Sequence, residues 1–136
     1  MKIIFTEDVP NADNLFALYE IEGWNNFLKL PKEDLHQAMV QSWCVLSAYH
    51  ENQLVGTARV ISDGIINAYL CGLIVHPDYR NMGIGTELIQ KLVDKCKKNN
   101  LHIQFFSEEK NKPYYEKQGF ERFAIGYKPK INEGNN

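Results

Sequence analysis

The amino-acid sequence predicts an α+β fold in which a mixed, mostly antiparallel sheet carries helices on both faces. Three β-rich segments in the middle of the chain are separated only by turn residues, and this pattern predicts an antiparallel meander. The most amphipathic helical segment then lies between two strand-like segments. A strand–helix–strand crossover joins parallel strands, so one parallel pair is expected. The expected order of elements is β-α-α-β-β-β-α-β-α-β.

The N-terminal third is predicted to hold one strand and two helices. The strand is Ile3–Thr6. Pro10–Asp13 contains the residue types that start a helix, and Gly23 is a typical C-terminal stop. A second helix is expected to open at Pro31, after an aromatic-bearing loop at Trp24–Leu30.

The meander is predicted from Cys44–His50, Leu54–Ser62 and Ile66–Val75, which are rich in β-forming residues. A turn at Glu51-Asn52 separates the first two segments. The pair Asp63-Gly64 is a strong hairpin signal, because both residues tolerate a positive φ.

The last third begins with the clearest helix, about Gly83–Lys98, which has its apolar residues on one stripe. A strand at Leu101–Phe106, a short helix at Lys112–Gln118 and a final strand at Phe120–Tyr127 are expected to follow. Residues 1–128 are therefore expected to form one domain, with a polar tail at 129–136.

Composition limits the classes of function. The chain has 136 residues, 44% of them hydrophobic, and a formal net charge of −2, so neither nucleic acid nor an anionic membrane is an expected partner. No signal-peptide core or membrane-length apolar run is present, which favours a soluble, cytoplasmic protein. Three separated cysteines, Cys44, Cys71 and Cys96, predict free thiols and no metal site.

The segment between the third meander strand and the long helix has the residue types of an anion site. Val75 ends the strand, Pro77 prevents its extension, and Arg80, Gly83 and Gly85 precede the helix. Glycines let a ligand approach the backbone, and helix N-termini carry unpaired N–H groups. This turn is therefore predicted to bind a pyrophosphate group.

Two common phosphate motifs do not fit this turn. A P-loop requires a lysine directly after its second glycine, and none follows Gly85. The dinucleotide fingerprint requires a third glycine where this chain has Leu88. A plain strand–turn–helix connection, with glycines only for the bend, stays open as the alternative.

Two segments resemble the GCN5-related N-acetyltransferase (GNAT) superfamily. Arg80-Asn81-Met82-Gly83-Ile84-Gly85 is similar to its R/Q-x-x-G-x-G/A signature, and Leu73–Tyr79 resembles the strand and loop that lead into it. Downstream, Pro113–Phe120 resembles the family's aromatic-Tyr-Glu-Lys-x-Gly-Phe segment. The resemblance covers nearly the whole chain and is strongest from Leu73 to Phe120.

The resemblance implies acetyl-CoA as co-substrate and no metal. The turn would hold the pyrophosphate, the strand before it would pair with the pantetheine arm, and a backbone N–H near Val75 would polarise the thioester carbonyl. The implied cofactor-binding residues are Leu73, Ile74, Val75, Arg80, Asn81, Met82, Gly83, Ile84, Gly85 and Thr86.

Tyr115 matches the family tyrosine that often protonates the leaving thiolate, and a phenol is a suitable acid for that step. The alternative is a core aromatic at a helix end. No general base is identified: His76 is the nearest titratable candidate, and its place beside the turn favours a solvated loop residue. Glu20, His50, Asp63 and His102 are further candidates without a positional argument.

Two positions depart from the family's pattern. Gly72 stands where several members carry an acidic residue, and Glu108 stands where many carry an asparagine that contacts the cofactor arm. Any acceptor contact at the first position and the cofactor contact at the second are therefore in doubt. Trp24 is a candidate wall of the acceptor pocket or, equally, a hydrophobic plug.

The implied function is transfer of an acetyl group from acetyl-CoA to a primary amine, by direct attack in a ternary complex. The acceptor is expected to be a small molecule, and the chain could form a homodimer. Two alternatives stay open: a non-catalytic acyl-CoA-binding or sensor module of the same fold, and an acetyltransferase that modifies a protein.

Overall fold

The computed structural model describes residues 1–130. Contacts divide the chain into two compact units, the first formed by residues 1–105 and the second beginning at Phe106. Each unit is described by itself. The tail predicted at 129–136 lies outside the described residues from 131 onward.

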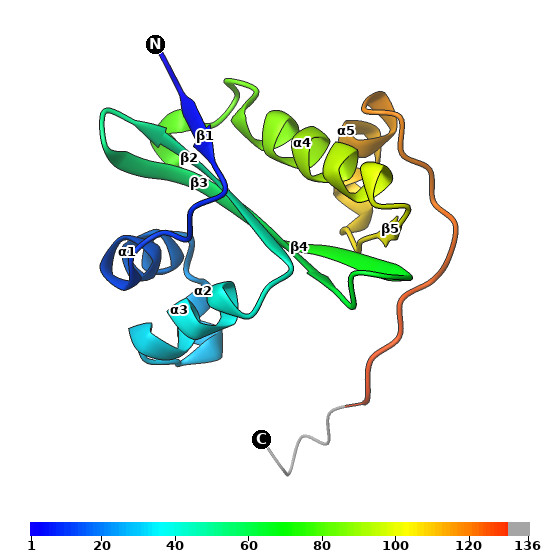
Figure 1. Ribbon diagram of the computed structural model, residues 1–136, viewed down its shortest axis with the longest axis horizontal. Coiled ribbons are helices and arrows are strands. Elements are labelled where there is room, and N and C mark those ends of the chain that lie inside the picture. The colour runs from blue at the N-terminus through cyan, green and yellow to red at the C-terminus, as the bar shows by residue number, and fades with distance from the viewer. Residues whose placement is uncertain (131–136) are drawn as a thin grey trace. The chain divides into compact units, whose positions relative to one another are not determined.

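The first unit contains a five-stranded sheet in the order β1-β2-β3-β4-β5 (Figure 1). Neighbouring strands from β1 to β4 are antiparallel, and β4 and β5 form the single parallel pair that the crossover predicted. The strands are β1 Ile4–Thr6, β2 Cys44–His50, β3 Gln53–Ser62, β4 Asn67–Val75 and β5 His102–Gln104.

Helices cover both faces of this sheet, as predicted. In Figure 1, α1 (Ala12–Glu22) and α3 (Lys32–Val40) lie on one side and α4 (Ile84–Lys98) lies on the other. Apolar side chains of α1 and α3 form one buried cluster with residues of β2, β3 and β4. The buried stripe of α4 against the other face is Ile84, Leu88, Ile89, Leu92, Val93 and Cys96.

The prediction of a loop at Trp24–Leu30 is wrong, because a short helix, α2, spans Trp24–Leu28. Gly23, with φ of 80°, ends α1 and starts α2. The buried Asn25 side chain then exchanges two hydrogen bonds with the Leu30 backbone, at 3.0 and 3.1 Å. A five-residue helix is too short to show the 3.6-residue periodicity by which sequence patterns reveal helices.

The final strand predicted at Phe120–Tyr127 is also wrong. The second unit contains the short 3₁₀ helix η2 (Glu109–Asn111) and the helix α5 (Lys112–Lys117), and residues 120–130 form no strand. The side chains of Phe123, Ile125 and Tyr127 are exposed. High β propensity produces a strand only where a neighbouring strand supplies hydrogen bonds, and this segment pairs with no other strand among the described residues.

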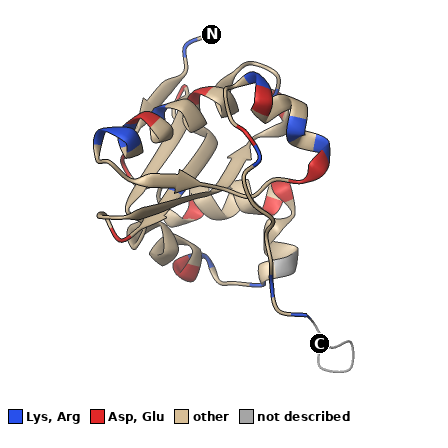
Figure 2. Ribbon diagram, turned by 90° about the vertical axis from the view of Figure 1, so that its right-hand side faces the viewer, with Lys and Arg blue, Asp and Glu red and all other residues tan. Residues whose placement is uncertain are grey.

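Charged positions of both signs are interspersed over the ribbon (Figure 2). Within α4, Glu87 and Asp94 alternate with Lys91 and Lys95. Of the helices in the described part of the chain, none is both long and apolar enough to cross a membrane. Cys44 and Cys96 are buried and Cys71 is partly buried, all three as free thiols.

Candidate active site

The predicted anion site lies where β4 passes into α4. A one-turn 3₁₀ helix, η1 (Pro77–Tyr79), follows β4, and the His76 side chain caps it by accepting the Asp78 N–H at 3.1 Å. Asn81 and Gly83 then take left-handed conformations, with φ of 63° and 82°. These two residues turn the chain so that α4 begins directly at Ile84.

The start of α4 has hydrogen-bond donors without acceptors. Gly83 is the N-cap residue and offers no side-chain oxygen to the first turn. Within residues 1–130, the backbone N–H groups of Gly83, Ile84 and Gly85 donate no hydrogen bond, whereas the Glu87 N–H already bonds the Gly83 carbonyl at 3.0 Å. Such N–H groups at the positive end of a helix dipole fit a phosphate oxygen.

A side chain at Gly83 would project into open space beside the start of α4. A Cβ built on Gly83 has no heavy atom within 4 Å. The absent side chain therefore leaves the backbone open, which agrees with close approach of a ligand.

The guanidinium of Arg80 bonds to groups of the protein itself, although its side chain is 47% exposed. Its Nη2 donates to both carboxylate oxygens of Glu22, at 2.7 and 2.9 Å, and its Nε donates to the Val75 carbonyl at 3.2 Å. Arg80 thus ties the end of α1 to the turn. The backbone N–H groups at the start of α4 stay open toward an anion, and within residues 1–130 none of the bonds of Arg80 involves its Nη1.

The second half of β4 has an unpaired edge within the first unit. β5 pairs with β4 only along Asn67–Tyr69. Farther on, Gly72 (φ of 69°) and Leu73 form a bulge that faces the single residue Ala58 of β3. Within the first unit, the edge beyond Tyr69 is therefore unpaired, and an extended ligand could pair with it.

Val75 presents its backbone groups along this open edge. The His76 N–H donates to the Val55 carbonyl of β3 at 2.8 Å, so His76 points toward β3. Backbone groups alternate in direction along a strand, which turns those of Val75 the other way. The bond from Arg80 Nε to the Val75 carbonyl agrees with this direction.

Tyr115 belongs to the second unit, on α5. Its ring contacts Tyr114 edge-on, with centroids 5.0 Å apart, and Phe120, with centroids 6.3 Å apart. Burial, with a smaller contribution from Tyr114, raises the pKa of the Tyr115 phenol, so the group keeps its proton at neutral pH. A protonated phenol is the state that a general acid requires, and the catalytic role of Tyr115 stays a prediction.

Four of the five candidate bases make hydrogen bonds within the protein. The His76 ring caps η1, and His50 Nδ1 lies 2.9 Å from the Tyr79 hydroxyl. Glu20 accepts from the Asn25 amide at 3.3 Å. Asp63 accepts the Ile65 and Ile66 N–H groups in the β3–β4 loop, and these bonds lower the pKa of its carboxyl.

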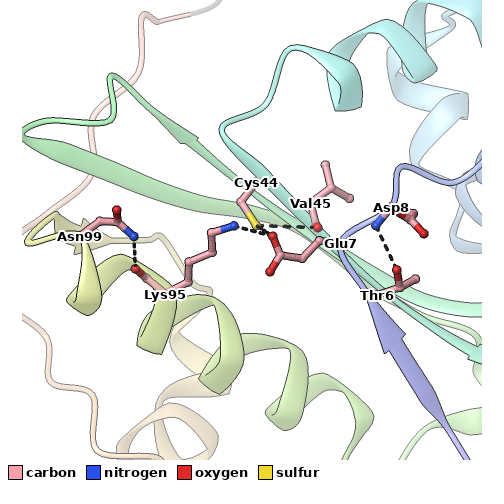
Figure 3. A network of polar contacts seen from close by, with 7 residues as sticks. All are labelled: Thr6, Glu7, Asp8, Cys44, Val45, Lys95 and Asn99. Atoms are coloured by element: carbon pink, nitrogen blue, oxygen red, sulfur yellow. Dashed lines mark hydrogen bonds and ion pairs between the residues drawn. The ribbon is translucent and has the colours of Figure 1, made fainter.

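A hollow of about 610 Å³ lies elsewhere, between β1, β2 and the later turns of α4. Lys95 bonds the Glu7 carboxylate there, and the Cys44 thiol donates to the same carboxylate at 3.7 Å (Figure 3). Lys95 is about 17 Å along the helix from Ile84, given the rise of an α-helix. This network joins β1, β2 and α4, and the hollow is separate from the turn at Gly83.

One residue that the sequence did not assign to a site is Arg59, in the middle of β3. It interrupts a strand whose neighbours Ala58 and Val60 are buried. Its Nε atom is shielded from solvent and has no hydrogen-bond acceptor. A lone cation within an apolar strand is the signal that could have indicated it.

No group of three metal-ligating side chains gathers anywhere in residues 1–130.

Comparison with known proteins agrees with this arrangement. The chain matches the Acetyltransferase (GNAT) family over residues 10–120. The uncharacterized N-acetyltransferase ycf52 of Pyropia yezoensis is 28% identical, over 93% of this chain and 78% of the relative. Histone acetyltransferase TAP1 of Glycine max is 30% identical, over 93% of this chain but 59% of TAP1.

A solved structure extends the comparison to the fold. The GNAT family acetyltransferase of Streptococcus pneumoniae aligns with a TM-score of 0.73 at 26% identity, over 97% of this chain and 98% of that one. The mixed sheet and its helices thus define an acyl-CoA N-acyltransferase fold. The chain belongs to the Acetyltransferase (GNAT) family.

Proposed function

We propose that this protein is an acetyl-CoA-dependent N-acetyltransferase that acts on a primary amine of a small molecule. The observation that carries the proposal is the set of open N–H groups at Gly83, Ile84 and Gly85, beside the unpaired edge of β4. Family membership supplies the reaction class. As a soluble enzyme using acetyl-CoA, it would work in the cytoplasm.

In the proposed reaction the neutral amine attacks the thioester carbonyl, a C–N bond forms and the C–S bond breaks. The Val75 N–H would stabilise the oxyanion of the intermediate, an effect that is often the largest single catalytic contribution. Tyr115 would give its proton to the departing thiolate. The proton lost by the amine would leave through water, since the proposal assigns no residue as the base.

The names of the relatives do not separate a small-molecule acceptor from a protein acceptor. One related chain is named a histone acetyltransferase, and this chain spans about 59% of that protein. A protein substrate therefore stays the competing acceptor class.

The test begins with calorimetric titration of the purified protein with acetyl-CoA. Saturable one-to-one binding is expected, and absence of binding at millimolar ligand would contradict the proposal. The second step measures thiol release with a panel of small amines and with histone-type peptides. Release that requires a small amine supports an enzyme, whereas tight binding without release from any acceptor identifies an acyl-CoA-binding module.

A further inference from the structure

The guanidinium of Arg59 is held on one side and unpartnered on the other. Its Nη1 donates to the Ser42 hydroxyl oxygen at 3.3 Å. The Ser42 hydroxyl donates its own proton to the Ala38 carbonyl at 2.8 Å, so its oxygen is left to accept. Arg59 Nε, in contrast, is shielded from solvent and bonds to no acceptor.

No carboxylate of the described chain neutralises Arg59. The ion pairs of residues 1–130 do not include it. Two carboxylates at the end of α1 are engaged elsewhere, Glu20 by Asn25 and Glu22 by Arg80. A shielded donor without an acceptor destabilises the protein, and a charged donor does so more strongly. A ligand that brings an oxyanion to this donor would relieve that destabilisation.

The unpartnered side of Arg59 has the geometry of a carboxylate fork. Because Ser42 takes Nη1, the Nε–H and Nη2 edge stays free, and two parallel donors on one edge match the two oxygens of a carboxylate or phosphate. The bond to Ser42 fixes the plane of the guanidinium. Less conformational entropy is then lost when an anion binds.

This edge lies next to the part of β4 that precedes the proposed cofactor arm. Arg59 pairs with Cys71, and a Cβ built on Gly72 would lie 3.6 Å from Arg59 Nε and 3.7 Å from the Tyr19 hydroxyl oxygen. Leu73 follows directly. An anion bound at Arg59 would therefore lie beside the bulge of β4, on the face of the sheet that carries α1 and α3. An amine on the same small molecule would then lie close to the proposed cofactor arm.

Aromatic side chains border the same place. Tyr19 meets Trp24 edge-on, with centroids 5.6 Å apart, and Trp24 is 37% exposed. Burial raises the pKa of the Tyr19 phenol, although the charge of Arg59 opposes the shift. Tyr19 thus keeps a proton that it can donate to an anion. Because the Arg59 Nε is shielded from solvent, an anion can bond to it only after the atoms that cover it move aside.

We propose that the acceptor is an amine that also carries a small oxyanion, a carboxylate or a phosphate, and that Arg59 binds this oxyanion through Nε–H and Nη2. The inference rests on the proposed function, because it names the substrate class of the same site. Arg59 holds the acceptor and takes no part in proton transfer.

The test compares matched amines in the thiol-release assay: phenylalanine with phenylalaninamide, and β-alanine with 2-aminoethylphosphonate. The oxyanion-bearing amines are expected to have a kcat/KM about 10- to 100-fold above the carboxamide, as expected for charge-assisted hydrogen bonds. In Arg59→Lys, which keeps the charge but loses the fork, this preference is expected to vanish while the acetyl-CoA Kd is unchanged. The carboxylate and phosphonate arms show which oxyanion is preferred.

Lys32→Gln is the matched control, because it removes an exposed cation paired with Asp13 and should leave the preference intact. A second readout needs no turnover: calorimetric binding of N-acetylphenylalanine, expected for the parent and lost in Arg59→Lys. Equal turnover of charged and neutral amines would overturn the inference and leave the acetyltransferase proposal standing. Absence of anion binding to the parent would overturn it even if no amine were acetylated.

Discussion

Replacement of Gly83 by alanine tests the proposed anion site, because its effect on acetyl-CoA affinity can be compared with its effect on stability. Gly83 has φ of 82° and ψ of 4°, and a Cβ at this position meets no heavy atom within 4 Å. The substitution therefore causes no clash, and its cost in stability is the left-handed conformation alone, about 1–2 kcal/mol. For a chain of this size the melting temperature should fall by roughly 3–8 °C. The protein stays folded, because domains typically have about 5–15 kcal/mol of stability.

The effect on acetyl-CoA affinity should be larger than strain explains. The new methyl group would stand where a phosphate must approach the N–H groups of α4. Loss of one charge-assisted hydrogen bond costs about 1.5–3 kcal/mol, which corresponds to a Kd roughly 10- to 100-fold weaker. Isothermal calorimetry with acetyl-CoA measures this change directly, and a urea melt measures the stability of the same preparation.

Gly119→Ala is the matched control. Gly119 has φ of 92° and also has no heavy atom within 4 Å of a built Cβ, but it follows α5 in the second unit. Both variants should lose similar stability, and only Gly83→Ala should lose affinity. If the two bind acetyl-CoA equally well, the placement of the pyrophosphate at this turn is refuted.

Three further predictions concern the acid, the packing of α4 and the thiols. Tyr115→Phe should lower kcat about 100-fold or more, because the reaction loses its general acid, while the acetyl-CoA Kd stays unchanged. Equal kcat of the two proteins in the thiol-release assay would exclude that role. Gly56→Val should destabilise the fold by about 1–3 kcal/mol in urea and also weaken acetyl-CoA binding, because a Cβ there already lies 3.2 Å from Ile84 and 3.3 Å from Leu88, on the first turns of α4. Burial raises the pKa of the Cys96 thiol, so the unfolded chain loses this proton first as pH rises. The contribution of Cys96 to the free energy of unfolding is therefore complete below about pH 8.5 and declines above it. Urea melts at several pH values should show the free energy of unfolding falling over this range. An unchanged pH dependence in Cys96→Ala would argue against Cys96 as its source.

The sequence determined the features that depend on local chemistry. The apolar stripe of α4 has helical periodicity, and its glycine-containing turn is recognisable from residues within one short segment. The strands of the meander match their predicted positions closely, since Glu51-Asn52 and Asp63-Gly64 mark their ends and residues 51, 52 and 64 all have a positive φ. Side-chain periodicity and turn conformation are properties of neighbours in the chain, so one sequence suffices to predict them.

Tertiary structure decided the features that depend on distant partners. The segment Phe120–Tyr127 has strand-forming residues, yet a strand exists only where another edge supplies hydrogen bonds. Glu22, 58 positions before Arg80, accepts two hydrogen bonds from its Nη2, a contact that the sequence did not predict. Ser42, which lies between α3 and β2, accepts a hydrogen bond only from Nη1 of Arg59. The Nε–H and Nη2 edge of Arg59 is therefore left without an acceptor. Pairings of this kind depend on how the helices pack on the sheet, and no local pattern in the sequence encodes them.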